Sequence, residues 1–185
     1  MKNMKKVFII CISLLMLVGC GCTLLKTPTK KVEELLNMYK MKDKDVMEEL
    51  DEYIAIQDLT DDQKDKYKEI ISKQYTDMKY EVTEETIDGE EATVTAKITV
   101  YDLYKVQKDA EEYLTDHKSE FYDETDTYDK TLFIDYKLEE MKSATDTVDY
   151  TVIFQLNKVD GTWEVDQLDN DTLEKIHGIY NYDND

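Results

Sequence analysis

The sequence of 185 residues contains no arginine, one proline, five glycines and three cysteines. All 23 basic residues are therefore lysines, and 43 acidic residues outnumber them to give a formal net charge of −20. Such a chain is repelled by phosphate backbones, which argues against nucleic-acid binding. Hydrophobic residues nevertheless make up 41% of the sequence and aromatic residues 10%. This composition is typical of a folded domain with a real core and not of a disordered chain.

The N-terminus has the three parts of an export signal in residues 1–19. Its positive region contains Lys2, Lys5 and Lys6. The apolar stretch that follows, residues 7–18, is too short to span a bilayer, which needs about 20 apolar residues. It ends in Leu17-Val18-Gly19-Cys20, which resembles the lipobox of bacterial lipoproteins, whose cysteine is acylated and becomes the new N-terminus. The alternative is an ordinary secretory signal followed by an unrelated cysteine.

The lipobox resemblance divides the chain into a signal peptide (1–19), a lipid-anchored tether (20–27) and one α+β extracytoplasmic domain (28–182). It implies that membrane lipid is a partner through Cys20 and that the protein lies on the extracytoplasmic face of the cell membrane. Because acylation consumes Cys20, only Cys22 remains, and no disulfide can form within the mature chain. The folded domain must be stable without one.

Apolar residues recur at helical spacing from residue 28 to residue 78. Thr27-Pro28 has the form of an N-cap followed by proline at the first helical position. A second helix is predicted from about Asp43, and Thr60-Asp61-Asp62-Gln63 has the form of a capping box that opens a third. The predicted core positions of the three helices are Val32, Leu35, Leu36, Tyr39, Val46, Leu50, Tyr53, Ile54, Tyr67, Ile70, Ile71, Gln74, Tyr75 and Met78.

The period then changes to two, which predicts strands. One alternating pair of segments flanks Asp88-Gly89, and a second flanks Asp160-Gly161. Asp-Gly between alternating segments is a strong β-hairpin signal. We therefore expect an α+β fold with N-terminal helices, two antiparallel β-hairpins in a curved four-stranded sheet, a helical insertion between the hairpins, and a C-terminal helix near Asp171.

This order of elements resembles the cystatin-like roll that nuclear-transport-factor-2-like domains share. In detail the chain is similar to uncharacterised lipoproteins of low-GC Gram-positive bacteria, a group without an established activity. The similarity lies in the segments Asp58-Leu59-Thr60-Asp61-Asp62-Gln63, Lys73-Gln74-Tyr75, Ile87-Asp88-Gly89-Glu90-Glu91-Ala92-Thr93-Val94 and Lys175-Ile176-His177-Gly178-Ile179-Tyr180. The resemblance implies a location and a fold, and no mechanism.

Motifs of catalysis and of cofactor binding are missing from the sequence. It contains no G-x-S-x-G, no Walker loop and no dinucleotide fingerprint, so we expect no cofactor and no enzymatic activity. His117 is predicted to be a core residue on the apolar face of its helix, and His177 to be a cation that complements a helix C-terminus. No ligand pair with the spacing of a zinc finger is present, so no metal is assigned.

Two weaker hypotheses remain open. Asp123, Glu124, Asp126 and Asp129 offer carboxylate oxygens from one segment and could bind calcium, although a solvated acidic loop explains them as well. Alternatively, the concave face of a roll could bind a small apolar ligand or catalyse an isomerase-like reaction, with Asp102 as the base. The tyrosines that could line such a face are Tyr101, Tyr104, Tyr113 and Tyr150.

The function that fits these observations best is a non-enzymatic binding or interaction module of the cell envelope, anchored by lipid. Its partner would be a cationic protein that binds the acidic surface, or a small apolar ligand. The alternative is a small-molecule pocket protein or an isomerase-like enzyme. Strong dependence of binding on salt distinguishes the first partner class from the second.

Overall fold

The computed structural model describes residues 27–122 and 125–184. The signal peptide, the lipobox with Cys20, and Cys22 all lie outside these residues. The described α-helices are α1 (Pro28–Met41), α2 (Lys44–Ala55), α3 (Asp61–Asp77), α4 (Leu103–Asp116), α5 (Lys130–Lys142) and α6 (Asn170–His177). The strands are β1 (Lys79–Asp88), β2 (Glu91–Tyr101), β3 (Thr147–Val159) and β4 (Thr162–Val165), and two short 3₁₀-helices are η1 (Lys118–Phe121) and η2 (Tyr182–Asn184).

The starts of the first and third helices are those that the sequence predicts. The Thr27 side chain accepts a hydrogen bond from the amide of Lys30, and Pro28 occupies the first turn of α1. The Thr60 side chain accepts from the Gln63 amide at 3.3 Å while the Gln63 side chain accepts from the Thr60 amide at 3.1 Å. This reciprocal pair is a capping box, which satisfies two amides that a helix start leaves without partners.

The four strands form an open antiparallel sheet in the order β1-β2-β3-β4. Both hairpins have two-residue loops, because Asp88 pairs with Glu91 and Val159 pairs with Thr162. In the second loop Asp160 and Gly161 have φ angles of 49° and 80°. Two successive positive φ angles match the twist of the flanking strands, as in a type I′ turn. The predicted pair of hairpins is therefore confirmed.

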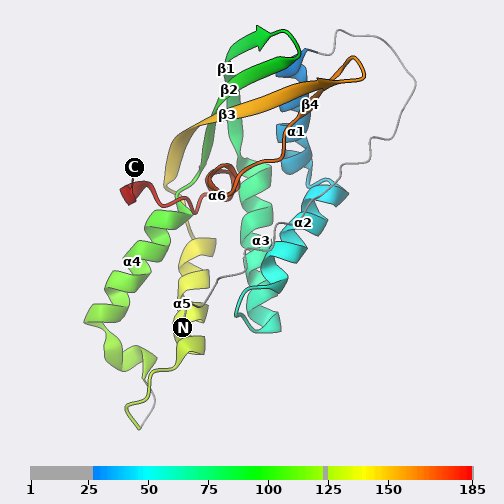
Figure 1. Cartoon of the computed structure of the whole chain (residues 1–185). Coiled ribbons are helices and arrows are strands. Elements are labelled where there is room, and N and C mark those ends of the chain that lie inside the picture. Colours follow the sequence, from blue (N-terminus) through cyan, green and yellow to red (C-terminus); the bar gives the residue numbers. More distant parts are fainter. Residues whose placement is uncertain (1–26, 123–124, 185) are drawn as a thin grey trace, which may run out of the picture.

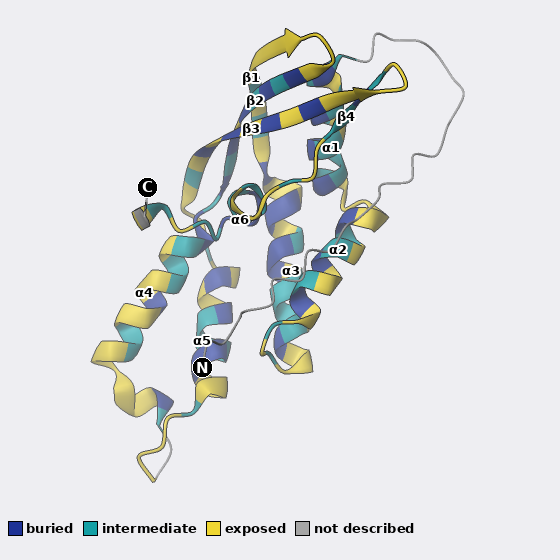
Figure 2. Ribbon diagram, viewed as in Figure 1, coloured by how far each residue is buried: buried dark blue, intermediate teal, exposed yellow. Residues whose placement is uncertain are grey.

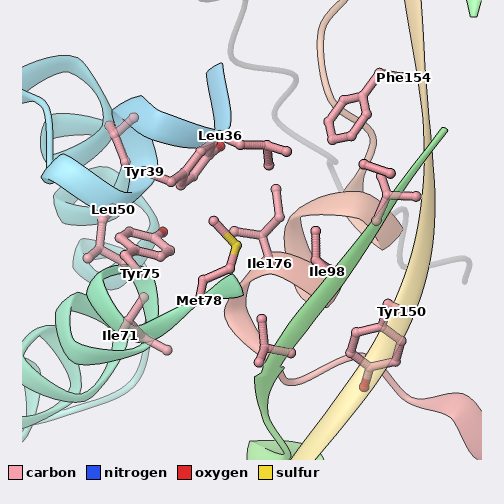
Figure 3. Packing of buried hydrophobic residues seen from close by; sticks show 14 of the residues in the cluster. Leu36, Tyr39, Leu50, Ile71, Tyr75, Met78, Ile98, Tyr150, Phe154 and Ile176 are labelled. Atoms are coloured by element: carbon pink, nitrogen blue, oxygen red, sulfur yellow. The ribbon is translucent and has the colours of Figure 1, made fainter. Parts of the chain in front are cut away.

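One face of the sheet packs on helices and carries the main core. The inward residues of β2 and β3 alternate with exposed ones, which gives the striped strands of Figure 2. Helices α1 and α6 and the end of α3 lie against the inward face. In Figure 3, Ile176 of α6 lies between side chains of the N-terminal helices, such as Met78 after α3, and strand residues such as Ile98.

Helices α4 and α5 form the predicted insertion between the two hairpins. They extend from one end of the sheet, opposite the end where α1 begins (Figure 1). The insertion begins and ends at one point, since the Asp102 amide donates to the Asp146 carbonyl at 2.9 Å. The outer part of the insertion has its own small cluster of buried residues: Ala110, Phe121 and Phe133. The architecture is thus α+β, with helices before, within and after the sheet, as the sequence predicts.

Candidate functional site

Gln74 of α3 is a buried polar residue that joins three segments. Its Nε2 donates to the carbonyls of Tyr101 at 3.0 Å and His177 at 3.2 Å, and its Oε1 accepts from the Tyr101 amide at 2.8 Å. These bonds hold the end of β2 and the end of α6 against α3. They fix the corner from which the candidate site is built.

Gly178 closes this corner. Its φ of +75° is unfavourable for residues with a side chain. A Cβ atom at this position would lie 2.1 Å from Gln74 Nε2 and 2.3 Å from the Tyr101 carbonyl oxygen. The Gly178 carbonyl also accepts from the Tyr104 amide at 2.8 Å. Only glycine lets α6 end this close to the start of α4.

Asp102 is the buried carboxylate of the corner. Its Oδ1 accepts from the Lys105 amide at 3.0 Å, so Asp102 is the N-cap of α4. Its Oδ2 accepts from the Tyr182 hydroxyl at 3.1 Å. Burial and the bond to Asp102 raise the pKa of Tyr182 to about 12. Tyr182 therefore stays a neutral donor at physiological pH and ties the C-terminal segment to α4.

A groove of about 530 Å³ opens beside the first half of β3. One wall is the strand itself, from Thr147 to Thr151. Lys175 of α6 and Tyr182 supply the other wall, and Asp102 lies at one end. The Lys175 ammonium nitrogen lies 4.5 Å from the centre of the Tyr180 ring, a cation–π contact that places the charge beside the groove.

The groove exists because β3 is much longer than its neighbour. β3 has 13 residues and β4 has four, so β4 pairs only with Leu156–Val159. The Asp166 amide extends the contact by one bond, to the Gln155 carbonyl at 2.9 Å. Within 27–122 and 125–184, no main-chain hydrogen bond reaches this edge of β3 between Thr147 and Ile153. Half of β3 is therefore an open sheet edge.

The hydrogen-bond pattern between β2 and β3 determines which main-chain groups of β3 point into the groove. In an antiparallel pair, successive residues direct their N–H and C=O groups alternately to one neighbour and to the other. The Lys158 amide donates across to the Glu90 carbonyl on the β2 side, and the Gln155 carbonyl accepts on the β4 side. Odd-numbered residues of β3 therefore face away from β2. The unpaired edge presents the N–H and C=O groups of Thr147, Asp149, Thr151 and Ile153.

The opposite edge of the sheet, β1, has a different character. It contains a bulge between Val82 and Glu84 and borders a depression of about 510 Å³. The Glu85 carboxylate accepts from the amide of Thr29 at 2.8 Å and from its hydroxyl at 2.7 Å. Bulges and inward charges protect sheet edges from further pairing. The β1 edge is protected in both ways, and the β3 edge is not.

The four tyrosines singled out from the sequence do not share one surface. Tyr150 lines the groove together with Asp102. The hydroxyl of Tyr101 donates to Asp77, and that of Tyr104 donates to Asp183. Tyr113 lies in the α4–α5 cluster at the far end of the molecule. The sequence reasoning missed Lys175 and Tyr182. The signal that could have found the open edge is the unequal length of the two alternating segments around Asp160-Gly161.

Both predictions for the histidines are wrong. α4 ends at Asp116, so His117 is an exposed C-terminal cap whose ring stacks on Tyr113 at 3.8 Å between centroids. His177 is buried, with its Nε2 2.7 Å from the Tyr75 hydroxyl. Burial lowers the pKa of His177 to about 4. His177 is therefore neutral at physiological pH and cannot act as the predicted cation.

The proposed calcium ligands are only partly described. Asp123 and Glu124 lie outside the described residues. Asp126 is exposed, and the Asp129 side chain caps α5 by accepting from the amides of Thr131 at 2.9 Å and Leu132 at 3.3 Å. In the part of the chain that the structure describes, no group of three or more His, Cys, Asp or Glu residues could hold a metal ion. The calcium site stays a prediction from sequence.

Comparisons with known proteins assign no family to the chain. No family model matches it, and no curated protein matches it. A solved structure that it resembles is that of ycdA from Bacillus subtilis, a protein provisionally described as a lipoprotein, with 16% sequence identity and a TM-score of 0.39. The match covers 81% of this chain, and the chain spans only 47% of that protein's length. The cystatin-like roll finds no support in this comparison. No helix among the described residues is both long and apolar enough to cross a membrane.

Proposed function

We propose that the chain is a bacterial lipoprotein anchored in the cell membrane through Cys20, and that its domain is a non-enzymatic binding module on the extracytoplasmic face. The support for the anchor is the lipobox Leu17-Val18-Gly19-Cys20 behind a charged and apolar signal. Two acyl chains would hold the protein stably, at ~0.8 kcal/mol per buried CH₂.

The position of the helix that follows the tether is the observation that carries the binding role. α1 begins at Pro28, and the neighbouring Thr29 contacts Glu85, close to the turn of the first hairpin. The α4–α5 pair and the start of β3 lie toward the other end of the molecule (Figure 1). The tether from Cys20 to Thr27 reaches roughly 25 Å at most. An anchor at Cys20 thus favours an orientation in which the groove and the helical pair point away from the lipid.

The charge of the domain supports a cationic partner. Cleavage after Gly19 removes three lysines and leaves −20 − 3 = −23 before acylation. The electrostatic field of such a net charge attracts positively charged proteins and speeds their association. A small apolar ligand is the competing partner class, and the groove walls, with Asp102, Asp149 and Lys175, fit it less well.

Native mass spectrometry of the lipoprotein extracted from its own membrane tests this proposal. We expect the mass of an acylated chain that starts at Cys20, together with a bound polypeptide that dissociates as salt is raised. The Cys20→Ala variant should lose both the added mass and the membrane association. A small molecule that stays bound at high salt would contradict the interaction module and favour the pocket protein.

A further inference from the structure

The unpaired edge of β3 is built to receive one more strand. We propose that this edge, from Thr147 to Ile153, binds an extended, lysine- or arginine-containing segment of a partner protein, which adds to the sheet as a fifth strand. The inference rests on the proposed function of a binding module and adds to it the place, the mode and the chemistry of binding.

The main chain supplies the attraction. Thr147, Asp149, Thr151 and Ile153 present alternating donors and acceptors with the spacing of a strand, held in register by the complete pairing of β3 with β2. An extended segment satisfies these groups in the way that β2 satisfies the other side. Strand addition of this kind draws its affinity from main-chain bonds and its specificity from alternate side chains.

The groove provides the room. The edge from Thr147 to Ile153 spans six residue steps, which corresponds to about 20 Å of strand at ~3.3 Å per residue. Along its first part the groove lies between the edge of β3 and the side chains of Lys175 and Tyr182, while the Tyr150 ring packs on Tyr180 at 5.8 Å between centroids. A bound strand would lie between β3 and the side chains of Lys175 and Tyr182.

Charge selects the occupant. Asp102, Asp146 and Asp149 lie at the start of the edge, and Asp149 also pairs with Lys97 of β2 at 2.8 Å. Among the described residues, Lys175 is the cation that lines the groove. A second copy of this chain could also pair edge to edge, but it would bring another net charge of −23 to the same place once residues 1–19 are removed. Like charges across an interface cost free energy, and opposite charges guide association. The observations therefore favour a basic segment over self-pairing.

Alternate side chains of the bound segment would meet two different surfaces. Those on the open face of the sheet lie beside Asp149 and Ile153, of which Ile153 is 58% exposed. A basic residue opposite Asp149 shares this carboxylate with Lys97 of β2, and the aliphatic stem of a second basic residue packs on Ile153. Those on the other face contact Tyr150 and Tyr182.

The test measures amide hydrogen exchange of the full chain in detergent micelles, with and without a seven-residue peptide of alternating lysine and valine. We expect the amides of Thr147, Asp149, Thr151 and Ile153 to exchange at least about tenfold more slowly with the peptide, since each becomes hydrogen-bonded. Two control peptides separate the causes. One carries glutamate in place of lysine, and the other carries N-methyl groups on alternate amides and keeps its charge. Neither should protect the edge.

Variants of β3 test the same point from the protein side. Thr151→Pro removes an outward amide, and proline is tolerated at an open edge. It should weaken binding of the lysine–valine peptide about tenfold, whereas Thr151→Val should not. Asp146→Lys, at an exposed position outside the strand, should weaken binding at low salt and less at high salt. Circular dichroism checks that each variant is folded.

Three outcomes would overturn the inference. The N-methylated peptide could bind as well as the parent, which would show attraction by charge alone. The peptide could slow the exchange of amides elsewhere, for example on the β1 edge. The edge amides could also be protected without peptide in a dimer seen by sedimentation, which would assign the edge to a second copy. If any of these occurs while native mass spectrometry still finds a salt-sensitive bound polypeptide, the binding module stands and only its site is wrong.

Discussion

The sheet-centred core and the α4–α5 pair are stabilised by different kinds of contact. The main core is largely aliphatic and draws on the three N-terminal helices, the strands, α6 and the inner turns of α5. The outer part of α4–α5 buries three residues, Ala110, Phe121 and Phe133, and surrounds them with stacked tyrosines and His117. Figure 2 shows α4 mostly exposed or half-buried along its length.

The helical pair is attached to the rest of the molecule by polar contacts and by the inner apolar side chains of α5, which belong to the main core. Gln63 of α3 donates to the Thr131 carbonyl at 3.3 Å and to the Asp135 carboxylate at 3.1 Å, and Lys142 pairs with Glu69 at 3.1 Å. Exposed ion pairs contribute about 1 kcal/mol or less each, far less than a buried aliphatic core. The comparison teaches that the two regions need not unfold together: the outer turns of α4–α5 can open locally while the sheet and the inner turns of α5 stay intact.

The corner at Gly178 should be the most sensitive point of the main core. We expect Gly178→Ala to lower the free energy of unfolding by at least about 3 kcal/mol, because its Cβ would overlap Gln74 and the Tyr101 carbonyl. Gly161→Ala is the matched control, since Gly161 has a φ of +80° but no atom within 4 Å of the added Cβ. It should cost only about 1–2 kcal/mol. Thermal and denaturant unfolding measure both, and equal losses would contradict the role of the corner.

The same substitution, phenylalanine to alanine, can be made in each of the two regions to compare their stability. Phe154→Ala removes a residue that is 1% exposed in the main core, and should lower the free energy of global unfolding by about 3–5 kcal/mol. Phe133→Ala acts on the small cluster. It should instead speed amide exchange mainly in α4 and α5, with a smaller global loss. Uniform acceleration over the whole chain by Phe133→Ala would show that the molecule unfolds as one unit.

The buried His177 offers the mildest test, through pH. His177 has a pKa near 4 when folded and an ordinary value of 6.5. Between these values the unfolded chain binds more protons, so stability falls as pH drops from about 6.5 to 4, by about 3 kcal/mol in all. Burial raises the pKa of Glu49 and Glu174, whose contribution has the opposite sign.

The difference between the parent chain and the His177→Gln variant isolates the effect of His177. His177→Gln should flatten this part of the pH profile of unfolding, measured by urea titration at each pH. A parent profile unchanged by His177→Gln would mean that His177 does not titrate as its burial requires.

Local patterns in the sequence predict much of the fold. The capping box at Thr60, the proline at the start of α1 and the two Asp-Gly turns each follow from neighbours within a few residues. The alternation of β2 and β3 identifies the buried face of the sheet. These features are predictable because the responsible groups are close in sequence.

The candidate site is less predictable because its parts are distant in sequence. The hydrogen bond between Tyr75 and His177 joins residues 102 positions apart, so spacing alone suggests a cation at position 177. His117 continues the apolar period of α4, but the helix ends one residue earlier. The groove depends on where β4 stops and on how α6 returns past β3, and neither follows from periodicity.

The bond between the Asp102 amide and the Asp146 carbonyl has an evolutionary consequence. Because β2 and β3 pair up to Tyr101 and Thr147, the whole insertion leaves the sheet and returns to it at the same point. Substitutions, duplications or deletions in its outer turns would not shift the strand register. The inner turns of α5 tolerate fewer substitutions, since Ile134, Leu138 and Met141 belong to the main core. Descendants of this protein can therefore change the tip of the helical pair freely and leave the edge of β3 as it is.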